Sequence, residues 1–338
     1  MTEKENSNNS LIPITSTGLV RVGNSIEVTN KILSEFNDRR LANFKFKGET
    51  VFQYFRNKGA INQLEINNDK LYIGCGSNDG SLVAWDINKN TINVEFTAIH
   101  GMIEALSVSS KNNIAAIGGF QDFSTTIIDL ENGNIIKKLI GHTRSISAVK
   151  FSPDGNFLIT ASHDKTLKVW ETTNWKCLHT LEGHEAIILS IEFSDNGEFL
   201  YSGGWDFYII EWDFQKLVQT RKIEAGWDTK ILKITKDCRY LVIGSGDKLI
   251  RIFNLKKNIT ETILQGHTDF VSALEFAENE TILFSGGWDG KIIVWDFMDR
   301  ELMKSIDAHS REISSLKYNS TNKTLTSGSW DKTVKFWL

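Results

Sequence analysis

An aspartate recurs along this chain of 338 residues at an almost constant interval. It stands six residues before a strand-ending aromatic or aliphatic residue seven times, at Asp79, Asp122, Asp164, Asp206, Asp247, Asp289 and Asp331. The successive intervals are 43, 42, 42, 41, 42 and 42 residues. Such a period indicates one repeated supersecondary unit, and about 40 to 45 residues is the length of a four-stranded propeller blade. The spacing therefore predicts seven blades.

The third repeat shows how the strands follow from the residues. Residues 146–151 (ISAVKF) suit an inner strand, and a turn containing Pro153 and Gly155 leads back into a second strand at 157–162. Proline presets its own φ, and glycine supplies φ > 0. Third and fourth strands are expected at 166–170 and 176–181. A sheet with two apolar faces cannot stand alone, so the prediction is an all-β ring of stacked antiparallel blades.

Two dipeptides recur in phase with the aspartates. Gly-His occurs at residues 141–142, 183–184 and 266–267, and Trp-Asp occurs at 85–86, 212–213 and 295–296. On these motifs residues 48–338 resemble the WD-repeat β-propeller family, and seven repeats in phase make the resemblance specific. It implies that a strand at residues 50–55 completes the last repeat and closes the ring. Closure of this kind removes exposed sheet edges.

Residues 1–47 form an extension outside the repeats. Its first ten residues are polar, and we expect them to be disordered. Residues 18–23 are expected to form a short strand. Thr29 is expected to cap a helix whose apolar stripe contains Ile32, Leu33 and Phe36.

Composition narrows the classes of function. The formal net charge is -4 and the pI about 6.0, with bases and acids interleaved, so no nucleic-acid partner is expected. Three scattered cysteines indicate neither a disulfide framework nor a zinc site. The chain shows no signal peptide and no long apolar stretch, so we expect no membrane association. The expected location is the cytoplasm, with the nucleus left open.

Four repeats carry a His, a Ser or Thr, an Asp and a Trp in fixed phase. These sets are His142, Thr160, Asp164 and Trp170; His184, Ser202, Asp206 and Trp212; His267, Ser285, Asp289 and Trp295; and His309, Ser327, Asp331 and Trp337. The residue types would suit a hydrolase triad, but a catalytic site is normally assembled once. A buried Asp in a turn can instead accept hydrogen bonds from such donors. We therefore expect four structural networks and no catalytic residue.

Three repeats depart from this pattern. The first, second and fifth lack the histidine, so their turns must be held in another way. Either these repeats have diverged, or they mark where something replaces the network. The sequence leaves both possibilities open.

Large aromatic residues gather at one end of the predicted ring. The second and fourth strands of a blade run toward the same end, so the residues before each Asp and the loops entering the first strands share one face. The candidate partner-binding residues there are Trp205, Trp227, Phe270, Trp288 and Trp330. Exposed Trp is frequent at interface hot spots, with Trp288 and Trp330 as the expected centre. The alternative is that each Trp stacks on its own neighbouring loop.

The favoured function is a non-enzymatic scaffold or adaptor that binds protein or peptide partners, as a monomeric propeller within a larger complex. Fold alone does not give function, so this rests largely on the resemblance. The alternatives are a substrate receptor of a ubiquitin ligase and an enzyme with an unrecognised site. Against the first, basic residues are absent two positions after Trp-Asp, where Asn88, Gln215 and Met298 stand. No cofactor or metal motif is present.

Overall fold

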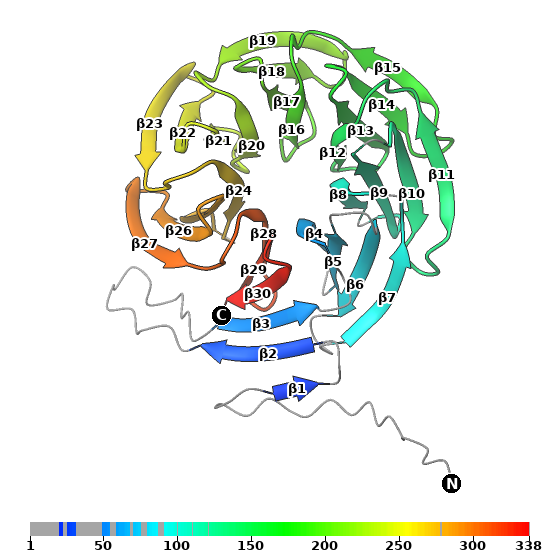
Figure 1. Ribbon diagram of the computed structural model, residues 1–338. Helices are drawn as coiled ribbons and strands as arrows, with labels where there is room; N and C mark the ends of the chain where they lie inside the picture. The colour runs from blue at the N-terminus through cyan, green and yellow to red at the C-terminus, as the bar shows by residue number, and fades with distance from the viewer. Residues whose placement is uncertain are drawn as a thin grey trace.

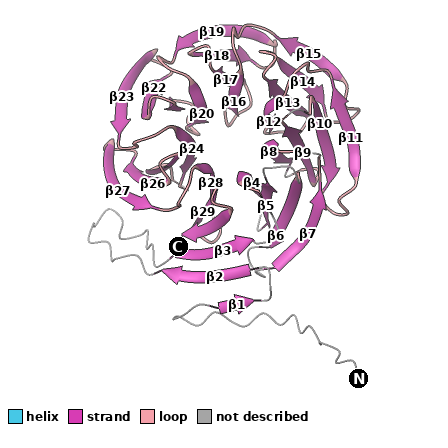
Figure 2. Ribbon diagram, viewed as in Figure 1, coloured by secondary structure: helices cyan, strands magenta, loops and turns pink. Residues whose placement is uncertain are grey.

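The fold consists of β-strands arranged around a central channel (Figure 1). The computed structural model describes residues 20–22, 26–31, 49–54, 59–67, 70–75, 80–86, 91–99, 101–109, 111–120, 122–277 and 279–337. Within these ranges every regular element is a strand, so Figure 2 shows magenta strands joined by pink loops. In the same ranges there is no helix with the length and hydrophobicity needed to cross a membrane.

The first three blades are four-stranded antiparallel sheets with their strands in chain order. Blade 1 contains β4 (Ile61–Asn67), β5 (Lys70–Cys75), β6 (Ser81–Asp86) and β7 (Thr91–Thr97). Blade 2 contains β8 (Ile103–Ser109), β9 (Ile114–Gly119), β10 (Ser124–Asp129) and β11 (Ile135–Ile140). Blade 3 contains β12 (Ile146–Phe151), β13 (Phe157–Ser162), β14 (Leu167–Glu171) and β15 (Cys177–Leu181).

The next three blades repeat this arrangement. Blade 4 contains β16 (Ile188–Phe193), β17 (Phe199–Gly204), β18 (Tyr208–Asp213) and β19 (Val218–Glu224). Blade 5 contains β20 (Thr229–Ile234), β21 (Tyr240–Ser245), β22 (Leu249–Asn254) and β23 (Ile259–Gln265). Blade 6 contains β24 (Val271–Phe276), β25 (Ile282–Gly287), β26 (Lys291–Asp296) and β27 (Glu301–Asp307).

Blade 7 is assembled from both ends of the chain. It contains β28 (Ile313–Asn319), β29 (Thr324–Ser329) and β30 (Thr333–Trp337), followed outward by β3 (Glu49–Tyr54), β2 (Ile26–Lys31) and β1 (Val20–Val22). β3 pairs antiparallel with β30 over five residue pairs, from Glu49 opposite Trp337 to Gln53 opposite Thr333. The predicted seven-bladed ring, closed by an N-terminal strand, is confirmed.

The extension differs from its prediction in one respect. The short strand expected at residues 18–23 is present as β1, but the helix expected from Thr29 is wrong at its start. Thr29 lies in β2, opposite Val51 of β3. The reason is that β3 offers an unpaired edge and the segment from Ile26 to Thr29 is rich in β-branched residues, which favour a strand. Residues 32–40 lie outside the described residues.

The turns in blade 3 follow from their residues. Gly155 has a φ of +70°, and its N–H donates to the carbonyl oxygen of Ser152 at 2.8 Å. Strands β12 and β13 have the predicted bounds, and β14 and β15 begin one residue later than predicted. Pro153 and Gly155 thus reverse the chain between the first two strands of the blade.

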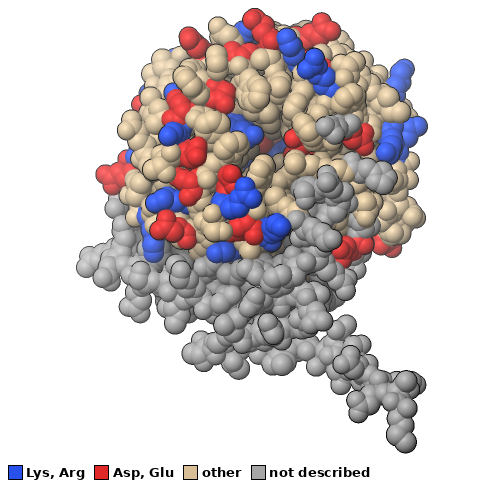
Figure 3. All heavy atoms as spheres, viewed as in Figure 1, with Lys and Arg blue, Asp and Glu red and all other residues tan. Residues whose placement is uncertain are grey.

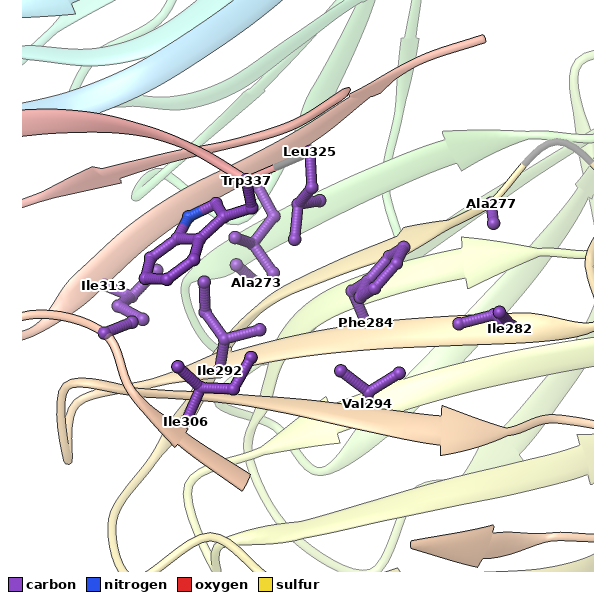
Figure 4. Packing of buried hydrophobic residues seen from close by; sticks show 12 residues of the cluster. Ala273, Ala277, Ile282, Phe284, Ile292, Val294, Ile306, Ile313, Leu325 and Trp337 are labelled. Carbon is purple, nitrogen blue, oxygen red and sulfur yellow. The ribbon is translucent and has the colours of Figure 1, made fainter. Parts of the chain in front are cut away.

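Apolar side chains fill the space between adjacent blades. Between blades 6 and 7, Trp337 and Phe284 are almost fully buried against Ile292, Ile306 and Ile313 (Figure 4). Each fully buried side chain of this size contributes about 1.5 to 3 kcal/mol relative to exposure. Because every blade has a neighbour on both sides, both of its faces are covered.

The inner strands line the channel with charges of alternating sign. The residues at one height are Glu65, Ser107, Lys150, Glu192, Lys233, Glu275 and Lys317, one from each blade. Three ion pairs join neighbouring blades: Lys150 to Glu192 at 2.9 Å, Lys233 to Glu275 at 3.0 Å and Lys317 to Glu65 at 3.1 Å. Burial by itself would raise the pKa of Glu192, but Lys150 and Lys233 beside it lower that pKa.

We predict that deletion of residues 1–56 opens the ring. The deletion removes β3, and with it about five backbone hydrogen bonds of about 1 kcal/mol each, and leaves β30 as an exposed edge that can template association. The truncated protein should melt at lower temperature and self-associate in size-exclusion chromatography. Deletion of residues 1–18 is the matched control. A monomeric 57–338 protein with an unchanged melting temperature would show that β3 does not hold the ring closed.

Candidate functional site

Four aspartates in the turns between second and third strands are held by side-chain networks. In blade 3, His142 Nδ1 lies 2.8 Å from Asp164 Oδ2, and His142 Nε2 lies 2.8 Å from Thr160 Oγ1. Trp170 Nε1 donates to the same hydroxyl oxygen at 3.0 Å. Because the carboxylate can only accept, we assign the imidazole proton to Nδ1, so that Nε2 accepts from the hydroxyl.

The same geometry recurs in blades 4, 6 and 7. The His Nδ1 to Asp distances are 2.7, 3.0 and 2.9 Å, and the His Nε2 to Ser Oγ distances are all 2.7 Å. Trp212, Trp295 and Trp337 donate to the serine oxygens at 2.8, 2.8 and 2.9 Å. The structure thus brings the four members of each predicted set together.

The hydroxyl groups of these sets are inaccessible. Thr160, Ser202, Ser285 and Ser327 are each 0 % exposed. A nucleophile must reach its substrate, and each of these oxygens already accepts a Trp N–H. The arrangement suits the locking of a turn and not acyl transfer. No group of three or more His, Cys, Asp or Glu residues in the described ranges is placed to hold a metal ion.

The networks stabilise the charged form of each aspartate. Burial alone would raise the pKa of Asp164, but the hydrogen bonds from His142, the Thr143 N–H and Thr166 outweigh it and hold that pKa well below its usual range. The same balance, with the histidine bond as the leading favourable cause, lowers the pKa of Asp206, Asp289 and Asp331.

Two of the three repeats without this histidine hold their aspartates by other contacts. In blade 5, Arg251 pairs with Asp247, with Nη1 at 3.0 Å from Oδ1, and also contacts Ser245 Oγ at 3.3 Å. In blade 2, the Ser124 N–H and hydroxyl donate to Asp122 at 3.0 and 2.6 Å. The turn of blade 1, from residue 76 to 79, lies outside the described residues.

Backbone hydrogen bonds fix the tryptophans that precede the Asp turns. At Gly204 a Cβ would meet the Ile187 carbonyl oxygen at 1.9 Å, so only glycine fits there. The Trp205 N–H donates to the same carbonyl oxygen at 2.9 Å. Trp288 and Trp330 make the equivalent bonds to Phe270 and Glu312. Each Trp therefore begins a turn that is fixed to the loop entering the first strand.

The five candidate partner-binding residues differ in exposure. Trp205, Trp227 and Trp288 are 52 %, 49 % and 37 % exposed, whereas Phe270 and Trp330 are half-buried. Trp288 stacks on Phe270 with ring centroids 4.7 Å apart, and the Arg311 guanidinium lies 5.8 Å from the Trp330 ring. Trp288 and Trp330 thus pack on their own loops, as the alternative interpretation had it, while Trp288 still presents part of its ring.

Three exposed phenylalanines escaped the sequence analysis. Phe207 is 50 % exposed, and Phe120 and Phe123 are 42 % and 48 % exposed. Phe123 and Phe207 directly follow the periodic aspartates Asp122 and Asp206, and that position would have been the signal. The structure puts these rings on the face that carries Trp205 and Trp227.

Among the described residues, exposed aromatic side chains and exposed aliphatic side chains lie in different parts of the molecule. The large aromatic ones lie in the Asp turns or in the loops beside them: Phe120, Phe123, Trp205, Phe207, Trp227 and Trp288. The aliphatic ones lie mainly in the outermost strands, as with Ile136 in β11 and Leu302 in β27. We call the surface formed by the turns and loops the aromatic face.

The central channel opens onto the aromatic face. The channel is a cavity of about 250 Å³ whose lining includes the charged inner-strand residues and also Trp288, Trp330, Glu104, His163 and Lys230. Burial raises the pKa of Glu104, although Lys230 acts against it, and burial lowers the pKa of Lys230. The channel lining thus combines two tryptophan rings with titratable side chains.

Comparison with known proteins places the repeats in a family. Residues 133–171 and 175–213 match the WD domain, G-beta repeat, and residues 256–335 match the tRNA methyltransferase TRM82 WD40 domain. The small ribosomal subunit protein RACK1 of Neurospora crassa is 34 % identical over 218 residues, which are 62 % of this chain and 69 % of that protein.

Two further relatives are much longer than the region that matches this chain. Pre-mRNA-processing factor 19 homolog 2 of Arabidopsis thaliana is 27 % identical over 60 % of this chain, which spans 39 % of that protein. Periodic tryptophan protein 2 of Saccharomyces cerevisiae is 30 % identical over 73 % of this chain and 27 % of its own length. The chain therefore spans less than two fifths of these two relatives.

We predict that Asp206→Ala and Asp289→Ala each lower the free energy of unfolding by about 2 to 4 kcal/mol, because buried His and backbone donors lose their acceptor. Urea denaturation measures the change. Asp195→Ala, at an exposed turn position of blade 4, is the control and should cost less than about 0.5 kcal/mol. Wild-type stability in both network variants would refute the structural role.

A pH dependence follows from the same aspartates. Their folded pKa values lie below the unfolded value of about 3.9. Their stabilisation is therefore complete above about pH 4 and is lost as the pH falls through the folded pKa values. Urea denaturation at pH 3 and pH 6 should show a large loss for the wild type and a smaller one for Asp206→Asn. Equal losses would contradict the assignment.

Proposed function

This chain belongs to the WD-repeat β-propeller family, and we propose that it is a non-enzymatic scaffold whose aromatic face binds protein or peptide partners within a larger complex. The observation that carries the proposal is the confinement of the large exposed aromatic side chains of the described residues to that face. Aromatic side chains exposed to water at one end of a rigid propeller form a surface that a partner can bury.

The energetics favour such a surface as an interface. Trp and Phe bury about 150 to 250 Å² each and lose few rotamers on binding. A few of them at the centre of an interface commonly supply most of its affinity. We infer two parts of the face. One contains Trp205 and Trp227, and the other contains Trp288, Trp330 and Phe270. In the second part Trp288 stacks on Phe270 and also borders the channel.

The functions named for related proteins support a role in assemblies. They include a small ribosomal subunit protein, a transcription initiation factor subunit and a U3 small nucleolar RNA-associated protein. By analogy we propose that this chain works as a monomeric propeller within a complex. These names belong to different cellular assemblies, so we propose no single compartment between cytoplasm and nucleus.

The match of residues 256–335 to the tRNA methyltransferase TRM82 WD40 domain supports a second candidate, membership of a tRNA-methylating complex. Direct tRNA binding by this chain is not the proposed route, because acids and bases are interspersed on the face shown in Figure 3. Assay of the purified native complex for methyl transfer to tRNA tests this candidate, and absence of the activity would reject it.

We predict that Trp205→Ala/Trp227→Ala keeps its melting temperature within a few degrees but loses its partners in a pull-down from native extract. Both rings are half exposed, so truncation costs the fold little, whereas a hot-spot Trp contributes about 2 kcal/mol or more to binding. Trp288→Ala/Trp330→Ala should also lose partners and should be less stable, because these rings are more buried.

The matched control is Met298→Ala, which removes an exposed side chain from a turn outside the aromatic face. It should keep both its stability and its partners. If both tryptophan variants fold and still capture every partner that the wild type captures, the binding surface lies elsewhere and the proposal falls.

A further inference from the structure

We propose that Trp205, Phe207 and Trp227 form a binding site for a proline-rich segment of a partner in the polyproline II conformation. We call these three residues the blade 4–5 patch, since Trp205 and Phe207 flank the Asp turn of blade 4 and Trp227 lies in the loop that leads into blade 5. This inference rests on the proposed function and names the chemistry of the partner at one part of the aromatic face.

Phe207 holds a backbone conformation that its side chain disfavours. Its φ is +64°, and the equivalent turn residues with positive φ are glycine at 80 and 290 and lysine at 165, 248 and 332. A bulky aromatic residue in the left-handed region is an outlier, and such strain concentrates at functional sites. The ring is nevertheless half exposed, so it gains little packing in return.

Trp227 stands where the histidine network has been replaced. Gly226 occupies the position of the missing histidine, and the Arg251 side chain approaches within 3.6 Å of a Cβ built there. Arg251 in turn pairs with Asp247 and so holds the turn of blade 5. Arg251 thus fixes the loop on its inner side, and the loop exposes the Trp227 indole to solvent. A loop that had merely diverged has no need of an exposed indole there.

The two rings are held next to each other by the backbone. The Ala225 N–H donates to the Phe207 carbonyl oxygen at 2.8 Å, and the rings of Phe207 and Trp227 lie with centroids 6.2 Å apart and planes inclined by 35°. This spacing is too wide for a tight stack and too narrow for a third ring between them. The rings therefore form a ridged platform and not a pocket.

The size of the patch selects a short segment over a second folded copy. Three half-exposed rings present about 300 Å², whereas a stable interface takes about 800 Å² from each partner. The charged residues near the patch favour neither an acidic nor a basic partner, because Lys222 pairs with Glu185 at 3.2 Å and the exposed Glu224 and Lys248 have opposite charges. The occupant is thus short and apolar without a required charge.

The location favours polyproline II over the other recognition modes. Strand addition needs a free sheet edge, and these turns lie at the ends of the strands. A bound helix needs a groove, and the patch is a platform. A polyproline II segment is already extended without internal hydrogen bonds, and its rings lie flat on exposed aromatic side chains.

The test uses fluorescein-labelled decaproline, with a labelled decapeptide of alternating glutamine and alanine as the peptide control. Fluorescence anisotropy with the full chain should show binding of decaproline at least about tenfold tighter than binding of the control. Phe207→Gly should weaken decaproline binding about tenfold or more. It should keep or raise the melting temperature, because glycine adopts a φ of +64° without strain.

The matched variant is Lys248→Gly, which makes the same change at the equivalent turn of blade 5, where φ is +74°, and leaves the three rings in place. It should change decaproline binding less than about twofold. Equal binding of both peptides, or undiminished binding by Phe207→Gly, overturns the inference. If decaproline does not bind, but Trp205→Ala/Trp227→Ala still loses the partners that the wild type captures from extract, this inference is wrong and the proposed function stands.

Discussion

The junction between blades 7 and 1 is the contact on which the rest of the ring depends, because only there do distant parts of the chain meet. The ladder between β3 and β30 lies within blade 7 and joins the two ends of the chain there. The inner strands of blades 7 and 1 add three contacts: Ser314 Oγ donates to the Ile61 carbonyl oxygen at 2.5 Å, the Leu64 N–H donates to Ser315 Oγ at 3.3 Å, and Lys317 pairs with Glu65 at 3.1 Å. Since β3 leads directly into blade 1, it ties the last blade to the first. A blade left open on one side would expose an apolar face as well as a sheet edge.

The channel imposes a second constraint, which arises from the odd number of blades. Charges that alternate in sign around a ring can close without a conflict only if their number is even. Here six charged residues form three pairs, and Ser107 takes the seventh position. Its hydroxyl accepts the Phe151 N–H at 3.2 Å instead. A negative residue at that place would stand beside Glu65 and a positive one beside Lys150, and the neutral serine avoids both like-charge contacts.

The sequence was sufficient for features that repeat. The Asp period specifies the number of blades, and turn residues such as Pro153 and Gly155 place the strands within a residue or so. Features that occur once could not be predicted in this way. The turn conformation of Phe207 and the use of Arg251 in place of a histidine depend on contacts between residues that are far apart or differ among blades. Thr29 illustrates the same limit, because a partner strand at the edge of blade 7 outweighed its potential as a helix cap.

The same short turn serves stability and recognition because its residues point in opposite directions. The carboxylate of Asp206 accepts from His184 at 2.7 Å in the interior, while Trp205 and Phe207 on either side of it are half exposed. Because the turn is fixed by bonds on its inner side, its aromatic rings lose little conformational entropy when a partner binds. Such preorganisation increases affinity without any new contact. In blade 5 the pairing of Arg251 with Asp247 does the same for the loop that carries Trp227. The networks therefore contribute to binding through the rigidity of the turns, although none of their own atoms need contact a partner.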